Sequence, residues 1–587
     1  MTQEPAKGGE FLLTDAVGKR TFSPEDFSDE QRQFAETTEE FIKKEVLPYL
    51  DRIEAQDFAL IVDKLRQCAD LGLFLVDVPE EYGGLELDKV TSMLLAEKIG
   101  PSGSFSITYG GQTGIGLLPL VYYGTKEQKQ RYLEKLVTGE WVGAYALTEP
   151  DCGSDPLSAR TKAVLSEDGS CYILNGVKQF ITNAGFADLF TVFAKIDGIH
   201  FSAFLVERGF EGFSVGAEEK KMGLKGSSTC QVVMENARVP VGNLLGEPGK
   251  GHKIAFNVLN IGRLKVAATA GGMAKGAFAE AARYAGERKQ FGRYIGEFGA
   301  IQEKLANMAA AIFASDSVVY RVAGLLDDRI ATLDRDGNDY GERYQKAIEE
   351  YAIECAIAKV FCTDVLADVV DEVVQVHGGY GYICEYPAER YYRDERIQRI
   401  FEGTNEINRI LIPTLLFRRG DSGMLDLWSK VDAEKGDLED FSWPANGASG
   451  TFDQEYAQLA YMKRAFYLLL GSSPEKRAIQ EVQIALADMA INIFAFESVL
   501  LRGANSLPGA SDFRRDLLQG MVKVAAFDNL SRFQLAATRC CAYSFTGNEL
   551  AMRLKFLAVI TLSPVEGLLE AKQLLAKAAK DAGKYFF

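Results

Sequence analysis

The stretch Tyr391–Ile412, YYRDERIQRIFEGTNEINRILI, decides how the rest of the chain is interpreted. A basic, helix-like run ends at Gly403, and an apolar-periodic run begins behind Thr404, a residue type favoured at helix N-caps. Glu402 is therefore expected at a tight joint between two helices, where a helix dipole helps to keep a carboxylate ionised and where catalytic groups often lie. Taken alone, Glu402 is more simply a solvated residue, one of 82 acidic side chains.

The length and charge of the chain limit its class. A chain of 587 residues is too long for one core and predicts about three or four domains. Its composition, 47% hydrophobic and 25% charged, is that of a globular protein. The net charge of -17 argues against a general nucleic-acid binder and against nonspecific adhesion to anionic lipid.

Cysteine and histidine usage indicates neither disulfides nor a metal centre. The nine cysteines are scattered and never spaced C-x-x-C, and the chain has three histidines. The N-terminal residues MTQEPAKGGEFLLTD lack the features of a signal or transit peptide, and no apolar run reaches the length of a membrane span. We therefore expect a metal-free, cytoplasmic protein of bacterial type, at most peripheral to a membrane.

Hydrophobic periodicity predicts a mostly α-helical chain with a central β domain. The period changes from 3.6 to 2 near Pro150, and five candidate strands follow before helical patterns return. A polar, glycine-containing stretch at 334–345 is expected to be an exposed loop. The predicted parts are an N-terminal arm (1–24), a helical domain (25–147), the β domain (148–252), a helical bundle carrying Glu402 (253–418), a linker (419–450) and a C-terminal helical domain (451–587).

Five motifs, in this order and at these separations, resemble the acyl-CoA dehydrogenases. They are AYALTEPDCGSD (144–155), KQFITNAG (178–185), ERKQFGRYIGEFGAIQEKLA (287–306), QVHGGYGYICEYPAERYYRD (375–394) and RIFEGTNEINR (399–409). The resemblance covers roughly residues 25–420, and the remainder is similar to the C-terminal helical extension of the very-long-chain members. It implies a helical domain, a β-barrel-like domain, a helical bundle and a C-terminal helical domain.

The resemblance implies a reaction. Such enzymes bind FAD between the β domain and the second helical domain and convert acyl-CoA to trans-2-enoyl-CoA in fatty-acid β-oxidation. Glu402 matches the base that removes the α-proton while a hydride passes to flavin N5; some relatives place the base where Gly262 stands here. An enolate needs hydrogen-bond donors, which the family supplies from FAD and from the backbone N–H matching Glu402. A desolvated pocket is expected to raise the pKa of Glu402.

The same resemblance implies the binding residues. Phe180 stands where the family usually has tryptophan, so its contact with the flavin is retained without an indole N–H. Positions matching flavin contacts within the subunit are Tyr145, Leu147, Thr148, Gly153, Ser154, Phe180, Ile181, Thr182, Thr404, Asn405 and Glu406. Positions matching contacts to the FAD of a neighbouring subunit are Arg288, Phe291, Gln302, Gln375, His377, Gly378 and Gly379, although Arg288 could be merely solvated and His377 merely a helix C-cap.

Substrate contacts are implied for Ser154, Asn260, Arg263, Phe401 and Gly403, with the acyl pocket ending near Ser106 and Gly110. Small residues at that end lengthen the cavity and favour long-chain substrates. The implied partners are an electron-transferring flavoprotein and a second copy of the chain in a dimer. The acidic 419–450 linker, unlike a basic interfacial helix, argues against membrane attachment.

Two other functions remain open at this stage. The chain could be a flavin oxidase, or a dehydrogenase of another thioester. It could also be a noncatalytic assembly protein that has kept the fold, since a fold does not fix a function.

Overall fold

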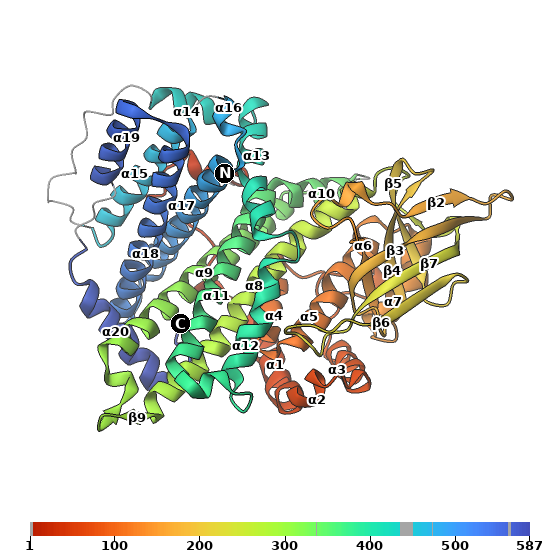
Figure 1. Ribbon diagram of the computed structural model, residues 1–587, viewed down its shortest axis with the longest axis horizontal. Helices are drawn as coiled ribbons and strands as arrows, with labels where there is room; N and C mark the ends of the chain where they lie inside the picture. The colour runs from red at the N-terminus through yellow and green to blue at the C-terminus, as the bar shows by residue number, and fades with distance from the viewer. Residues whose placement is uncertain (1–3, 336, 338, 435–449, 472–473, 561–564) are drawn as a thin grey trace.

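The structure is a computed structural model that describes residues 4–335, 337, 339–434, 450–471, 474–560 and 565–587. The β domain lies at one end, the long bundle helices lie in the middle, and the C-terminal helices lie at the other end (Figure 1). The predicted fold class, mostly helical with a central β domain, is confirmed.

The N-terminal helices begin where the sequence supplies caps. The side chains of Ser28, Asp57, Asp88 and Thr125 each accept a hydrogen bond from the backbone of the first turn that follows. These helices are α1 (Asp29–Phe41), α2 (Leu50–Glu54), α3 (Phe58–Asp70), α4 (Lys89–Ile99), α5 (Ser104–Gly110), α6 (Leu118–Tyr123) and α7 (Lys126–Val137).

The β domain is one eight-stranded sheet with the order β6-β7-β3-β2-β4-β5-β8, to which β1 is added beside β4. The five predicted strands are present, and β1, β6 and β8 were missed because β1 is buried on both faces and the other two are short or glycine-containing. The strands are β1 (Gly143–Ala146), β2 (Lys162–Leu165), β3 (Cys171–Thr182), β4 (Leu189–Ile196), β5 (His200–Glu207), β6 (Phe213–Glu218), β7 (Thr229–Pro240) and β8 (Leu244–Leu245).

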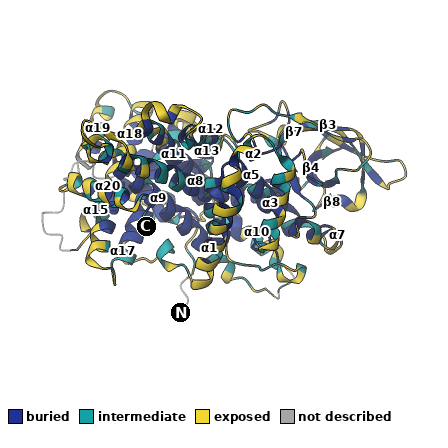
Figure 2. Cartoon of the chain, turned by 90° about the horizontal axis from the view of Figure 1, so that it is seen from below, coloured by how far each residue is buried: buried dark blue, intermediate teal, exposed yellow. Residues whose placement is uncertain are grey.

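Helix α8 (Gly251–Glu287) forms the centre of the bundle, packed against α4, α9 (Gly299–Ala331) and α11 (Ala352–His377). Figure 2 shows these helices largely in the dark colour of buried residues. The remaining elements are the short strands β9 (Lys289–Gln290) and β10 (Arg293–Tyr294) and the helices α10 (Tyr340–Glu350), α12 (Pro387–Glu395) and α13 (Asn405–Asp421). Helix α10 corrects the second half of the loop expected at 334–345, since it begins at Tyr340 and is anchored by buried Ala347 and Ile348.

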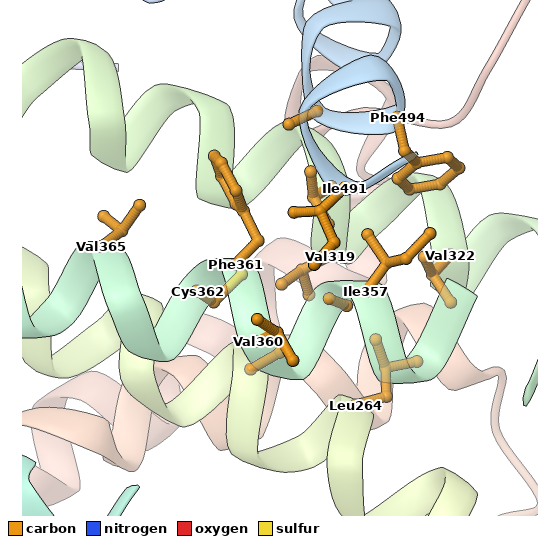
Figure 3. Packing of buried hydrophobic residues seen from close by; sticks show 14 of the residues in the cluster. Leu264, Val319, Val322, Ile357, Val360, Phe361, Cys362, Val365, Ile491 and Phe494 are labelled. Atoms are coloured by element: carbon orange, nitrogen blue, oxygen red, sulfur yellow. The ribbon is translucent and has the colours of Figure 1, made fainter. Parts of the chain in front are cut away.

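The C-terminal helices share a hydrophobic core with the bundle. Ile491 and Phe494 point at Val319 and Ile357 of the bundle (Figure 3). The helices are α14 (Leu427–Ala433), α15 (Asp453–Leu470), α16 (Pro474–Arg477), α17 (Gln480–Ser506), α18 (Asp512–Ser544), α19 (Gly547–Ile560) and α20 (Leu568–Ala582). Of the described helices, α9 and α17 are long and apolar enough to cross a membrane, and both are mostly buried inside the fold.

Two predicted segments differ from their structure. The described part of the 419–450 linker contains α14, held by buried Leu427 and Val431, while residues 435–449 lie outside the described residues. The N-terminal segment is not a free arm. Phe11 lies edge-on against Phe494 with ring centroids 4.9 Å apart, and the amide of Gly9 donates to Glu354 Oε1 at 2.6 Å.

Candidate active site

A cavity of about 1030 Å³ lies where α5, α8 and α13 meet the β domain. It collects residues from six separate parts of the sequence. The predicted residues that line it are Ser106, Gly110, Tyr145, Leu147, Thr148, Gly153, Ser154, Phe180, Ile181, Thr182, Asn260, Arg263, Phe401, Glu402 and Gly403.

Glu402 lies on a strained joint between two helices, as the sequence predicted. Its φ is +55° and that of Gly403 is +80°, so two successive residues adopt the left-handed conformation. For a glutamate this conformation costs roughly 1–3 kcal/mol, and such strain is often found at functional sites. Thr404 then caps α13, with its hydroxyl accepting from the amide of Ile407 at 3.2 Å.

The side chains of Asn408 and Arg263 hold the Glu402 loop in this shape. The side-chain amide of Asn408 donates to the carbonyl of Gly403 at 2.7 Å and lies within 3.4 Å of the carbonyl of Glu402. Arg263 Nε also donates to the carbonyl of Glu402, at 3.3 Å. These contacts hold the backbone of Glu402 and leave its carboxyl group free to face the cavity.

The carboxyl group of Glu402 is a buried and incompletely satisfied acid. Among the described residues, its Oε2 has no hydrogen-bond partner. Burial raises the pKa of Glu402 to about 7, against the opposing charges of Arg263 and Lys359. A carboxyl group that titrates near neutral pH and lacks a partner suits general-base catalysis.

Gly262 provides the space for this carboxyl group. A Cβ atom built on Gly262 would lie 2.9 Å from Glu402 Oε2 and 3.1 Å from its Cδ. Any larger residue at this position of α8 would therefore displace the acid. A side chain at position 262 would therefore point at the place that the carboxyl group of Glu402 occupies.

Arg263 and Asn260 form a second polar group on α8. Arg263 Nη1 donates to Asn260 Oδ1 at 2.9 Å, and both side chains are buried. Burial lowers the pKa of Arg263, and the nearby Glu402 opposes that shift. The pair places donors on the cavity wall beside the acid.

A buried ion pair that the sequence did not reveal fixes the turn after β1. Lys178 Nζ lies 2.7 Å from Glu149 Oε1 and also donates to the carbonyl of Leu147 at 3.2 Å. Glu149 in turn accepts from the amides of Arg160 and Thr161, at 2.6 and 3.1 Å. The TEPDCGSD segment is therefore a rigid wall of the cavity. The signal for this ion pair in the sequence was Lys178, a lysine within a strand otherwise rich in apolar residues.

Phe180 presents an aromatic ring to the cavity. It has φ +59° and lies at a register shift between Lys178 and Ile181 in the pairing of β3 with β7. The bulge leaves the side chain 61% exposed, although it lies between buried neighbours. An exposed phenylalanine at a cavity wall suits stacking against a flat aromatic ligand.

The residues predicted to contact the FAD of a neighbouring subunit lie outside the cavity lining of the single chain. Phe291 is 92% exposed, and Arg288 lies over the ring of Tyr380 at 5.5 Å. His377 is buried, stacks on Tyr284 at 4.3 Å and is the last residue of α11, whose C-cap is Gly378 and not His377 itself. Also outside the lining are Gln302, Gln375, Gly378 and Gly379.

The three residues at the start of α13 that were predicted to contact the flavin lie outside the cavity lining. The side chain of Asn405 is buried and faces α11, where its Oδ1 accepts from Lys359 Nζ at 2.6 Å. Thr404 uses its hydroxyl as the helix cap, and Glu406 is exposed. None of the three side chains lines the cavity. Lys359, which also donates to the carbonyl of Gly403 at 3.0 Å, was missed because a lysine inside an apolar helix gives no motif.

Known proteins are similar to this chain over part or nearly all of its length. Family models of the acyl-CoA dehydrogenase N-terminal, middle and C-terminal domains match residues 28–140, 144–237 and 249–415. A probable acyl-CoA dehydrogenase of Bacillus subtilis (strain 168) is 43% identical over 586 residues, which are 99% of this chain and 98% of that protein. The mitochondrial very long-chain specific acyl-CoA dehydrogenase of Mus musculus is 41% identical over 360 residues, 60% of this chain and 52% of that protein.

A solved structure is similar over the same length. The acyl-CoA dehydrogenase of Bacillus anthracis, crystallised in complex with FAD, superposes with a TM-score of 0.95 at 43% identity, covering 99% of this chain and 100% of that one. The similarity therefore includes the C-terminal helices. The chain belongs to the acyl-CoA dehydrogenase family.

Proposed function

We propose that the protein is an FAD-dependent acyl-CoA dehydrogenase that converts acyl-CoA to trans-2-enoyl-CoA. The observation that carries the proposal is the carboxyl group of Glu402, which is buried, lacks a partner for Oε2 among the described residues and has its pKa raised to about 7. It lies on the wall of a cavity large enough for a cofactor and an acyl chain.

The β-domain wall fits FAD. Phe180 offers an exposed ring, Thr182 offers a hydroxyl, and a Cβ built on Gly153 meets no atom within 4 Å, so the turn leaves open space. The phenolic oxygen of Tyr145 is buried without a partner among the described residues, as expected for a group that faces a ligand. FAD, when bound there, supplies a hydride acceptor.

The reaction requires a proton to leave the α-carbon of the thioester. In our proposal Glu402, once ionised, takes that proton, while its backbone N–H donates to the thioester carbonyl and stabilises the enolate-like transition state. Arg263 and Asn408 keep this backbone in place through the carbonyl of Glu402. The surrounding apolar walls exclude water and keep the acid poorly solvated.

We further propose that two copies complete each site. The exposed Phe291 and the nearby Arg288, both outside the lining of this chain's own cavity, are suited to reach the FAD of a neighbouring subunit. The assembly is then a homodimer, and its electrons pass to an electron-transferring flavoprotein. We place this activity in cytoplasmic fatty-acid β-oxidation.

Long acyl chains are the proposed substrates. Ser106 and Gly110 line the far part of the cavity, and a Cβ built on Gly110 meets nothing within 4 Å. This open end supports an acyl chain longer than butyryl. Rapid turnover of butyryl-CoA with none of palmitoyl-CoA would contradict this assignment.

The test is an anaerobic visible spectrum of the purified protein before and after palmitoyl-CoA is added. We expect yellow flavin that bleaches, and a Glu402→Gln variant that keeps its flavin but does not bleach. A bleaching Gln variant would refute the role of Glu402. Fast reoxidation by O₂ would indicate an oxidase, and a protein that cannot bind FAD would indicate the noncatalytic alternative.

A further inference from the structure

The loop that carries Glu402 is tied to the inside of the bundle by a lysine. Lys359 of α11 is fully buried, and its ammonium donates to the carbonyl of Gly403 at 3.0 Å and to Asn405 Oδ1 at 2.6 Å. Both acceptors lie within three residues of Glu402. The ammonium thus ties the loop to α11.

The polar contacts continue outward from Asn405. Its Nδ2 donates to Asp364 Oδ1 at 2.8 Å, and the other oxygen of Asp364 accepts from Arg409 Nη2 at 2.6 Å. Arg409 Nε in turn donates to Asp488 Oδ1, also at 2.6 Å. Asp364 belongs to α11, Arg409 to α13 and Asp488 to α17, so the chain of contacts ends in the C-terminal region.

Arg409, in the second turn of α13, joins three helices. Its side chain is 19% exposed, and those of Asp364 and Asp488 are 29% and 24% exposed. Burial disfavours the arginine's charge, but the two carboxylates raise the pKa of Arg409 above its usual range. Charge-assisted hydrogen bonds in such partly buried positions are stronger and more directional than exposed pairs.

The position of α13 matters to Glu402 because this helix starts three residues later. Its cap, Thr404, and the amide of Asn408 set the backbone of the strained joint. A left-handed glutamate persists only where its surroundings hold it. A small shift of the first turn of α13 therefore reaches the carboxyl group directly.

We propose that Asp488, in the C-terminal helical region, is a positioning residue for Glu402, which it holds through Arg409 and the first turn of α13. The inference rests on the proposed function for its catalytic consequence. It assigns to the C-terminal helices a part in holding the base of the active site, beyond extending the hydrophobic core.

The chain offers a matched control. Asp368 is one turn beyond Asp364 on α11, and its Oδ2 accepts from Arg532 Nη2 of α18 at 2.7 Å. This pair also joins the C-terminal region to the bundle, but its further ion pair, from Arg532 Nε to Asp528 Oδ2 at 2.9 Å, stays within α18. Asp488→Asn and Asp368→Asn therefore remove the same charge and the same kind of contact between the same two regions.

In the full-length, FAD-loaded protein we expect Asp488→Asn to lower kcat with palmitoyl-CoA about tenfold, the loss that a displacement of about half an ångström causes in a catalytic group. KM should change less than twofold, and the acid limb of the pH profile should move. Asp368→Asn should match the wild type in kcat, in KM and in the pH profile. Asp488→Glu, which keeps the carboxylate, should recover part of the lost kcat.

Hydrogen–deuterium exchange gives a readout that does not depend on turnover. Peptides covering residues 400–412 should exchange faster in Asp488→Asn than in Asp368→Asn. Equal kcat and equal exchange in the two variants would overturn the proposal. If Asp488→Asn does not fold, Arg409→Lys, which loses the two-sided contact, takes its place with the same two outcomes. A wild-type protein that turns over no acyl-CoA would refute the proposed function, and exchange alone would then decide the positioning role.

Discussion

Replacing Gly262 by alanine tests the geometry of the acid most directly. The new Cβ atom would lie 2.9 Å from Glu402 Oε2 and 3.1 Å from its Cδ. Ordinary contacts between such atoms begin near 3.4 Å, so the carboxyl group must move by about 0.5 Å. We expect this shift to reduce kcat roughly tenfold, or about 1.4 kcal/mol in the barrier, since a 1 Å displacement of a catalytic group costs about a hundredfold.

Gly271 supplies the control for this experiment. It lies in the same helix, α8, is also buried, and a Cβ atom built on it comes no closer than 3.9 Å to Asp316 Oδ1. Both substitutions remove a glycine from a helix interior, which favours the folded state by up to about 1 kcal/mol. Stability and activity should therefore separate: Gly262→Ala loses activity without losing stability, and Gly271→Ala keeps both.

The assay is single-turnover flavin bleaching under anaerobic conditions, with the thermal midpoint measured alongside. A bleaching rate for Gly262→Ala within twofold of that for Gly271→Ala would refute the reasoning, because the acid would then not occupy the space beside Gly262. A loss of bound flavin in Gly262→Ala would instead show that the displaced group disturbs the cofactor site.

Three further outcomes are expected. Gly110→Leu fills the far end of the cavity, so kcat/KM should fall severalfold or more for palmitoyl-CoA and stay near wild type for butyryl-CoA. Equal losses for the two substrates would contradict the placing of the acyl chain at Gly110. Lys359→Met removes a charge that lowers the pKa of Glu402. The acid limb of the kcat/KM profile lies near pH 7 because the base must be ionised, so this limb should move to higher pH in the variant. A limb that stays in place or moves to lower pH would count against Glu402 as the base. Asp394 has its pKa raised by burial from 3.8 to about 7, so the stability that its neutral form contributes is lost as pH rises from about 4 to about 7. Asp394→Asn keeps an acceptor for the amide of Leu224 and should gain thermal stability relative to wild type between pH 5 and pH 8, as scanning calorimetry can check; a constant difference would exclude this linkage.

Local patterns predicted much of the fold. The change of period near Pro150 located the β domain, and alternation revealed five of its strands. Thr404 was recognised as a cap because that preference is set within a single turn. Where the local signal was weak, prediction failed: the start of α10 was taken for a loop, and β1, buried on both faces, shows no alternation.

The sequence predicted some residues of the site but not the direction in which each side chain points. Residues in motifs, such as Glu402 and Phe180, line the cavity. Asn405 belongs to the same motif, yet its side chain faces α11, because Lys359 and Asp364 satisfy its amide there. A motif places a residue near a site, but the partners that turn its side chain come from other helices.

The sequence by itself determined the order of the helical and β parts, because this order depends on residue type and on spacing within one element. Its motifs also indicated the family and, through that resemblance, Glu402 as the candidate base. Tertiary structure decided the rest. The raised pKa of Glu402 comes from burial, and the space for it comes from Gly262, 140 positions earlier in the chain. The contact between Arg409 and Asp488 joins residues 79 positions apart. Burial, clearance and long-range hydrogen bonds arise only when distant segments pack, so no window of sequence contains them.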